Sequence, residues 1–121
     1  MSVEENKAVA RRWNEEVMNG RQLEAFDQVL HKDYVNRSGT ESSWATSLQG
    51  IEHAKRYFEE AYQRMPDWQV VIEDIIGEGD CVAVRGVFTN KGKPTANFIS
   101  FYRLSDGKIV DDWYCARQLD Q

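Results

Sequence analysis

The sequence has few of the residues that hold metals or form disulfides, with two cysteines, two histidines and two prolines among 121 residues. Because zinc ligands usually come in closely spaced Cys or His pairs and these residues are isolated from one another, so sparse a set predicts no bound metal. Cys81 and Cys115 each lie in a strand-like run. They could form one disulfide, but reduced, buried thiols are the expectation for a cytoplasmic chain.

An excess of positive charge and a long apolar run are missing as well. The net charge is -5 at pH 7, whereas nucleic acids and anionic membranes attract basic surfaces. No apolar run approaches the roughly 20 residues that span a bilayer. The first six residues lack the basic start and apolar core of a signal peptide. We therefore expect a cytoplasmic protein with neither a nucleic-acid nor a membrane partner.

What is present fits one domain, residues 1–121, with enough aromatic side chains to fill a core. The first half is helical in pattern, because apolar residues recur at three- and four-residue spacing. This predicts helices over residues 9–18, 23–30 and 50–64. Between the last two helices, residues 37–49 are mostly small and polar, and a loop of this length is often functional.

The second half changes to β-branched and aromatic runs separated by turn signals. Strands are predicted over residues 68–76, 81–89, 97–104 and 109–118. The last turn contains Asp106-Gly107, a pair that accepts the positive φ angles of a type I′ hairpin. Helices followed by consecutive antiparallel strands make an α+β fold, with the helices on one face of a curved sheet.

Four stretches of the chain carry a family resemblance, and they are residues 6–17, 33–36, 65–74 and 101–113. In this order and spacing, the chain resembles the SnoaL-like polyketide cyclase family of the nuclear transport factor 2-like (cystatin-like) superfamily. The resemblance implies a cone-shaped fold, in which three N-terminal helices pack on a strongly curved, mostly antiparallel sheet around an apolar cavity. It also implies a homodimer formed through the outer face of the sheet.

The resemblance directs attention to Asp112 and Tyr114 as catalytic candidates, since they stand where the family typically has His and an acid/base Asp. Strand alternation puts both on one face. A carboxylate in an apolar cavity has a raised pKa and becomes a better base. A tyrosine hydroxyl can donate to a developing enolate. In the alternative interpretation, Asp112 pairs with an arginine, Arg85, Arg103 or Arg117, and Tyr114 only packs.

Eight further residues are expected to form the wall of the ligand site, because small-molecule sites are largely apolar with a few polar groups. Asn36 could orient a ligand carbonyl or cap a turn. Trp44 could cover the mouth of the pocket or pack down onto the core. The eight residues are Trp13, Tyr34, Asn36, Trp44, Tyr57, Trp68, Arg85 and Phe101.

The leading functional hypothesis is a protein that binds a small apolar carbonyl compound and cyclises or isomerises it by acid/base chemistry. Such chemistry requires no cofactor, and none is expected. The alternative is a non-catalytic ligand-binding or dimerisation module on the same scaffold, which the missing carboxylate at Tyr114 motivates. A third class, an epoxide hydrolase, would need several acids and an arginine around one water, and Asp112 with Arg85 matches this poorly.

Overall fold

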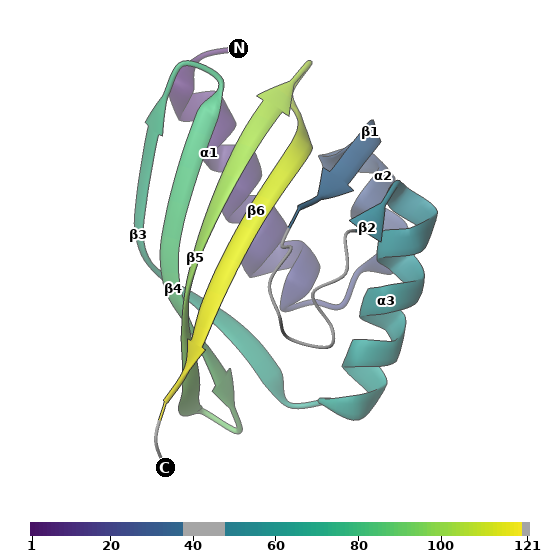
Figure 1. Ribbon diagram of the computed structural model, residues 1–121, viewed down its shortest axis with the longest axis vertical. Helices are drawn as coiled ribbons and strands as arrows, with labels where there is room; N and C mark the ends of the chain where they lie inside the picture. Colours follow the sequence, from purple (N-terminus) through teal and green to yellow (C-terminus); the bar gives the residue numbers. More distant parts are fainter. Residues whose placement is uncertain (38–47, 120–121) are drawn as a thin grey trace.

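The computed structural model describes residues 1–37 and 48–119, which form a sheet flanked by helices (Figure 1). The first helix, α1, spans Val3–Arg12. It begins with a capping box, in which the Ser2 hydroxyl accepts from the Glu5 backbone N–H at 3.1 Å and the Glu5 carboxylate accepts from the Ser2 N–H at 2.9 Å. One π-helical stretch, Trp13–Met18, continues it. The predicted first helix is therefore confirmed and begins earlier than its apolar pattern.

The other two predicted helices are also present. The second consists of a short 3-10 turn, Leu23–Ala25, followed by α2, Phe26–Val29. The third, α3, spans Ile51–Arg64. It ends just before Pro66, whose ring cannot be accommodated in a helix interior.

The strands form one six-stranded sheet in the order β2-β1-β6-β5-β4-β3. The four long strands pair consecutively and antiparallel, as predicted. The turn between the last two has Asp106 at φ 53° and Gly107 at φ 75°, which is the expected type I′ geometry. The strand bounds are Leu30–Asn36 for β1, Leu48–Gln49 for β2, Trp68–Glu78 for β3, Cys81–Asn90 for β4, Lys93–Ser105 for β5 and Lys108–Gln118 for β6.

The sheet is less strongly curled than the family resemblance implies, which corrects that expectation. In Figure 1, β3 to β6 form a twisted layer with α1 behind it, while α3 stands beyond β1 and β2. Each antiparallel pair of long strands has one shift in register, for example between Ile72 and Asp74. Bulges bend strands locally. Because pairing is regular between these points, the layer twists instead of rolling into a cone.

The core lies between the inner face of the sheet and the helices. Its largest fully buried side chains include Tyr34, Tyr102 and Phe26. Trp13 and Phe26 meet edge to face, with ring centroids 4.9 Å apart, a geometry that aromatic rings favour. No helix among residues 1–37 and 48–119 is long and apolar enough to cross a membrane.

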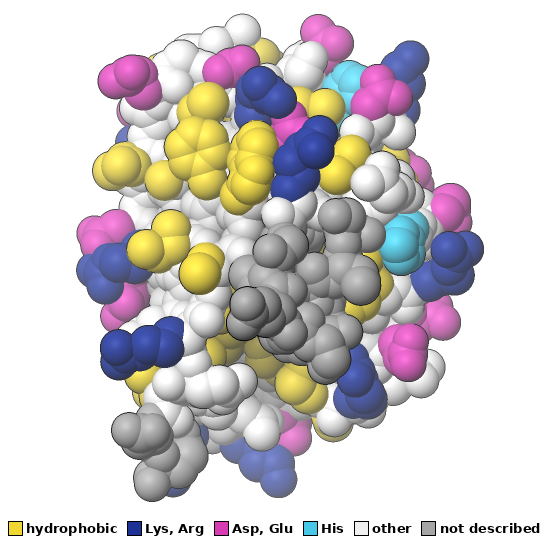
Figure 2. Space-filling view, in the orientation of Figure 1, with side chains coloured by type: hydrophobic (Ala, Val, Ile, Leu, Met, Phe, Trp, Pro, Cys, Tyr) yellow, Lys and Arg dark blue, Asp and Glu magenta, His cyan; other side chains and the backbone are white. Residues whose placement is uncertain are grey.

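The outer face of the sheet carries an apolar row that crosses all four long strands. Register pairs Ile76 with Ala83, Ala83 with Phe101, and Phe101 with Trp113. We call these four residues the outer row. Figure 2 shows hydrophobic side chains running across the upper part of this face. Phe101 and Trp113 remain 42% and 38% exposed, although their rings lie 5.8 Å apart.

Candidate functional site

A cavity of about 760 Å³ opens between the inner face of the sheet and the helices. Its volume falls in the range of small-molecule sites, roughly 300–1,000 Å³. The π-helical stretch after α1, the inner face of α3 and strands β3 to β6 all contribute to its wall. Most of that wall is apolar, and its polar groups include Asp112 on β6, Ser100 and Tyr102 on β5, and Asn36 at the end of β1.

Aromatic rings cluster on one side of the cavity. Phe88 and Phe98 stack at 4.4 Å with their planes 8° apart, and Trp68 lies 5.1 Å from Phe88. Tyr114 adds a ring 5.9 Å from Phe88. These stacked and tilted rings give that side of the cavity a large apolar surface, which suits an apolar ligand.

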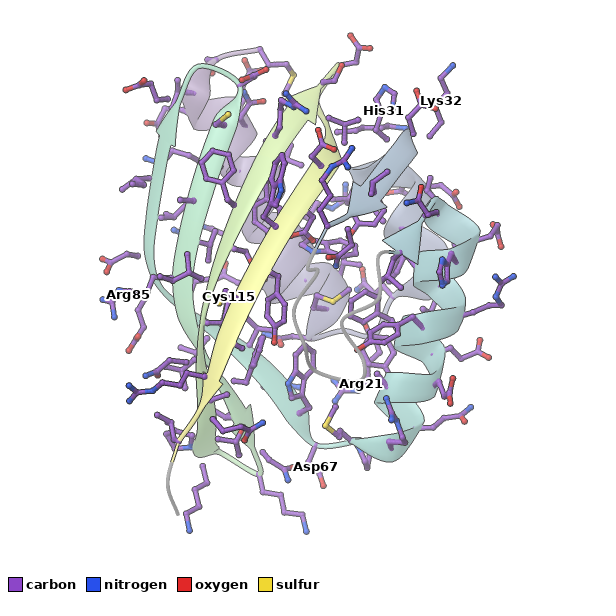
Figure 3. The ribbon with its side chains drawn as sticks, viewed as in Figure 1. Arg21, His31, Lys32, Asp67, Arg85 and Cys115 are labelled. Atoms are coloured by element: carbon purple, nitrogen blue, oxygen red, sulfur yellow. The ribbon has the colours of Figure 1, made fainter. Side chains whose placement is uncertain are left out.

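Arg21 fixes the segment that delivers Trp68 to the cavity. Its guanidinium donates to the carbonyls of Pro66 and Trp68, each at 2.7 Å. Beside it, the Asn19 side chain pairs with the backbone of Val70 at 2.9 and 2.7 Å, in the manner of a short strand. Figure 3 shows Arg21 at this end of the molecule, near Asp67. Polar contacts from the turn after the first helix thus hold the start of β3.

Asp112 is the buried carboxyl group of the cavity, with 5% of its surface exposed. The Tyr34 hydroxyl donates to its Oδ2 at 3.1 Å. Its other oxygen, Oδ1, has no hydrogen-bond partner among the described residues. Burial raises the pKa of Asp112 to about 7, and the hydrogen bond from Tyr34 opposes part of that rise. The carboxyl group is therefore poised to exchange a proton near neutral pH.

The neighbouring residue, Asp111, takes the ion pairs that the alternative interpretation gave to Asp112. Arg37 donates to its Oδ1 at 2.8 Å, and Arg103 donates to its Oδ2 at 2.9 Å. Burial acts to raise the pKa of Asp111, but the hydrogen bonds from Arg103 and Arg37 outweigh it and lower the pKa. Among the described residues, no arginine pairs with Asp112. Strand alternation has placed the two acids in opposite environments.

Tyr114 lies two residues further along β6 and also lines the cavity, so the structure brings the two catalytic candidates to one wall. Burial, with smaller contributions from Tyr57, Cys115 and Asp112, raises the pKa of Tyr114. At neutral pH its hydroxyl therefore keeps its proton and can act as a hydrogen-bond donor.

The predicted wall residues divide into those that reach the cavity and those that do not. Trp13, Asn36, Tyr57 and Trp68 line it. Tyr34 is fully buried behind Asp112 and contacts the site through that carboxyl group. Trp44 falls outside the described residues.

Arg85 and Phe101 do not line the cavity, contrary to the expectation from sequence. Arg85 is exposed and forms ion pairs with Glu73 and Asp74 on the outer face. Figure 3 shows it on the side of the sheet away from α3. Phe101 belongs to the outer row. Both misplacements have one cause, because strand positions alternate between faces and the sequence alone did not fix which face was inner.

The polar residues of the cavity wall that were missed from sequence include Asn14, Ser100 and Tyr102. Tyr102 is the cross-strand partner of Asp112 in the β5–β6 hairpin. Counting back from the Asp-Gly turn approximates this pairing, but a register shift between Arg103 and Leu104 intervenes.

The two cysteines are both unpaired, and no metal-binding group of three His, Cys, Asp or Glu side chains forms within the described ranges.

The fold and the site together define a small α+β protein of the nuclear transport factor 2-like class, with a buried carboxyl group in an apolar cavity. The SnoaL-like domain family matches residues 10–112. The chain therefore belongs to this family. No curated protein matches the chain.

Solved structures with the same fold share little sequence with the chain. IdmH, a proposed polyketide cyclase from Streptomyces antibioticus, is 22% identical over 93% of this chain and 91% of its own, with a TM-score of 0.72. A proposed ketosteroid isomerase from Kribbella flavida is 21% identical over 98% and 82%, with a TM-score of 0.78. Bal32a, from a soil-derived mobile gene cassette, is 15% identical over 94% and 90%, with a TM-score of 0.83. At these identities the likeness shows the fold alone.

Proposed function

We propose that this protein binds a small, largely apolar carbonyl compound in its cavity and acts on it by acid/base chemistry at Asp112. The observation that carries the proposal is a buried carboxyl group whose Oδ1 has no partner among residues 1–37 and 48–119, and whose pKa burial raises to about 7. A general base works best when its pKa is close to the working pH. Polyketide cyclases and ketosteroid isomerases, the activities proposed for IdmH and the Kribbella protein, both fit this class of substrate.

In this mechanism Asp112 Oδ1 removes a proton from the carbon next to the ligand carbonyl. The electron pair of the broken C–H bond forms a C=C bond, and the carbonyl π electrons move onto oxygen as an enolate. Tyr114, with Asn36, stabilises that negative charge by hydrogen bonding. If the ligand also has a C=C bond next to the deprotonated carbon, the enolate is a dienolate, and return of the proton from Asp112 to its far carbon gives an isomer. Alternatively, attack of the enolate carbon on a second carbonyl of the same ligand closes a ring, and the alkoxide formed from that carbonyl takes the proton from Asp112.

Hydrogen–deuterium exchange tests the base directly without knowledge of the natural substrate. The probe is 2-tetralone, a flat bicyclic ketone with acidic hydrogens next to its carbonyl. In deuterated buffer we expect the protein to accelerate exchange at that carbon, measured by proton NMR, with a rate that rises as pH passes about 7. Asp112→Asn should abolish the acceleration, because an amide is not a base. The control Arg85→Gln should retain it, since Arg85 lies on the outer face.

A non-catalytic ligand-binding module is the second candidate, favoured by the tyrosine at position 114, where the family typically has a carboxylate. Titration of tryptophan fluorescence with 2-tetralone separates the two, because Trp13 and Trp68 line the cavity. Binding without accelerated exchange would support the module and reject the base. Accelerated exchange that survives in Asp112→Asn would also reject Asp112 as the base.

We also propose that the chain forms a homodimer through the outer face of the sheet. The outer row gives that face an apolar stripe, and the two ends of the stripe differ in charge. Arg37 and Arg103 lie over the Trp113 ring at one end, each 6.0 Å from its centroid, and share the carboxylate of Asp111. Exposed Asp74 and Glu78 lie on β3 at the other end, where Arg85 pairs with Glu73 and Asp74. The first end is therefore net basic and the second net acidic. A two-fold axis through the middle of the stripe would place the basic end of one copy against the acidic end of the other.

A further inference from the structure

The side chain of Asn14 fixes the direction in which the Tyr102 hydroxyl can donate. The Asn14 amide nitrogen donates to the carbonyl of Ala10 at 2.9 Å and to the Tyr102 hydroxyl oxygen at 3.1 Å. An amide nitrogen can only donate. The Tyr102 oxygen must therefore be the acceptor of that bond, and its own hydrogen points elsewhere.

Within the described part of the chain, the Tyr102 hydroxyl donates its own hydrogen to no acceptor. Burial is the main cause of its raised pKa, with a further rise from the charge of Asp112, while hydrogen bonds from Asn14 and Ser100 lower it. Tyr102 therefore carries its proton at neutral pH, while two neighbouring donors stand ready to stabilise charge that develops on its oxygen.

The Tyr102 hydroxyl and Asp112 Oδ1 belong to paired residues that line the same cavity. Tyr102 and Asp112 are directly opposed on β5 and β6, and both line the cavity. Opposed residues on a sheet face have Cβ atoms about 4.5–5.5 Å apart. Asp112 Oδ1 lacks a partner among the described residues, so the two groups do not satisfy each other. A bound molecule that offers a hydrogen to Asp112 and an oxygen to Tyr102 would satisfy both.

We propose that Tyr102, oriented by Asn14, is the catalytic residue that donates a hydrogen bond to the carbonyl oxygen of the ligand while Asp112 acts on the adjacent carbon. This inference rests on the proposed function and adds Tyr102 to Tyr114 and Asn36 as a hydrogen-bond donor to the carbonyl oxygen. The ligand class that fits both groups is a ketone with an acidic hydrogen next to the carbonyl, because such a ketone offers a hydrogen to Asp112 and an oxygen to Tyr102. As Asp112 takes the proton and charge moves to the carbonyl oxygen, the Tyr102 O–H bond stays intact and its hydrogen bond strengthens.

Infrared spectroscopy of 2-tetralone labelled with ¹³C at the carbonyl tests this role without requiring turnover. A hydrogen bond to the carbonyl lowers its stretching frequency. We expect the band of the bound ketone to lie lower in the wild-type protein than in Tyr102→Phe, and the exchange rate to fall roughly 100-fold in that variant. Asn14→Leu keeps the Tyr102 hydroxyl but removes the hydrogen bond that orients it. The carbonyl band and the exchange rate in this variant should therefore lie between those of the wild-type protein and of Tyr102→Phe.

The outcomes separate this inference from the proposed function. If Asp112→Asn abolishes exchange but Tyr102→Phe leaves both band and rate unchanged, Asp112 remains the base and Tyr102 is not the donor. If Asp112→Asn retains exchange, the base is wrong, yet the carbonyl band still reports on Tyr102. Near-ultraviolet circular dichroism checks that each variant is folded. If Tyr102→Phe does not fold, the carbonyl band and the exchange rate of Asn14→Leu test the role of Tyr102 instead. Failure of the wild-type protein to bind 2-tetralone counts against both proposals.

Discussion

Two adjacent carboxyl groups on β6 show how much a single step along a strand changes. Asp111 faces two guanidinium groups, and its pKa is lowered. Asp112 faces the cavity and Tyr34, and its pKa is raised to about 7. The sequence predicted that Asp112 and Tyr114 share a face, because this needs only the two-residue period of a strand. It did not predict which arginines meet which acid, since that depends on the register between strands.

The raised pKa of Asp112 makes a prediction about stability. Below pH 3.8 the folded and unfolded states both carry the proton. Between that value and about 7 the unfolded state loses it first, so the free energy of unfolding falls with rising pH. At 1.36 kcal/mol per pH unit, the loss is at most about 4 kcal/mol. Urea denaturation of wild type and Asp112→Asn at about pH 5 and about pH 8 should show the wild type losing stability relative to the variant.

Asp111 titrates in both proteins, so its contribution cancels from this comparison. A stability difference between wild type and Asp112→Asn that does not change between the two pH values would contradict a raised pKa at Asp112. It would also remove the main support for Asp112 as a base near neutral pH.

Tyr34 makes a prediction about the pH dependence of activity. Its hydroxyl donates to Asp112 at 3.1 Å and favours the ionised carboxylate. In Tyr34→Phe this bond is lost, so the pKa of Asp112 should rise and the midpoint of the exchange rate should move above about 7. Tyr62→Phe is the matched control, because the Tyr62 hydroxyl contacts the sulfur of Met18 at 3.6 Å and its loss should leave the midpoint in place. An unchanged midpoint in Tyr34→Phe would mean that Tyr34 does not set the proton affinity of the site.

At the scale of the element, the strands were easier to predict than their faces. β-branched runs and an Asp-Gly turn gave four strands in the right order, because these signals are local. The assignment of Arg85 and Phe101 to the cavity failed, because each strand has two faces and apolar residues occur on both. On β4, Val82 and Val84 are buried on the inner face, while Ala83 and Val87 lie on the outer face. On β5, Phe98 is buried on the inner face, while Phe101 is exposed on the outer face.

Gly86 on β4 packs closely against the Phe98 ring, which forms part of the aromatic side of the cavity. A Cβ at this position would lie 2.5 Å from the Val71 carbonyl oxygen and 2.7 Å from the Phe98 ring. Gly86→Ala must therefore displace either the backbone or the ring that stacks on Phe88. We expect a loss of about 1–3 kcal/mol in the free energy of unfolding and weaker binding of 2-tetralone, measured by urea denaturation and fluorescence titration.

Gly77→Ala is the matched control for Gly86→Ala, because its new Cβ would meet the flexible side chains of Val3 and Lys7, the nearest atom at 2.9 Å. These side chains can move, so the cost should be smaller and ligand binding unchanged. If the two variants lose equal stability and both bind 2-tetralone as the wild type does, the tight contact behind Phe98 does not shape the cavity.

At the scale of the whole molecule, the order of helices and strands was predictable from the sequence, but the polar contacts that build the buried site were not. Periodicity identifies which elements exist and which positions are apolar. The hydrogen bond from Asn14 to Tyr102 joins residues 88 positions apart, and the pairing of Tyr102 with Asp112 depends on the register between β5 and β6. Such contacts follow from how the layers pack, for which a single sequence carries no local signal.

The outer row makes the last prediction, which concerns assembly. We expect the wild-type chain of 14.0 kDa to behave as a dimer of about twice that mass in size-exclusion chromatography with light scattering. Phe101→Asp places a charge at the centre of the apolar stripe and should weaken the dimer by about 2 kcal/mol or more, or roughly 30-fold. Asn97→Asp adds the same charge on the same face of β5, outside the row, and should leave the dimer intact. Because Phe101 lies away from the cavity, the monomeric variant should still bind 2-tetralone. A wild-type monomer, or a dimer untouched by Phe101→Asp, would show that the outer row is not the interface.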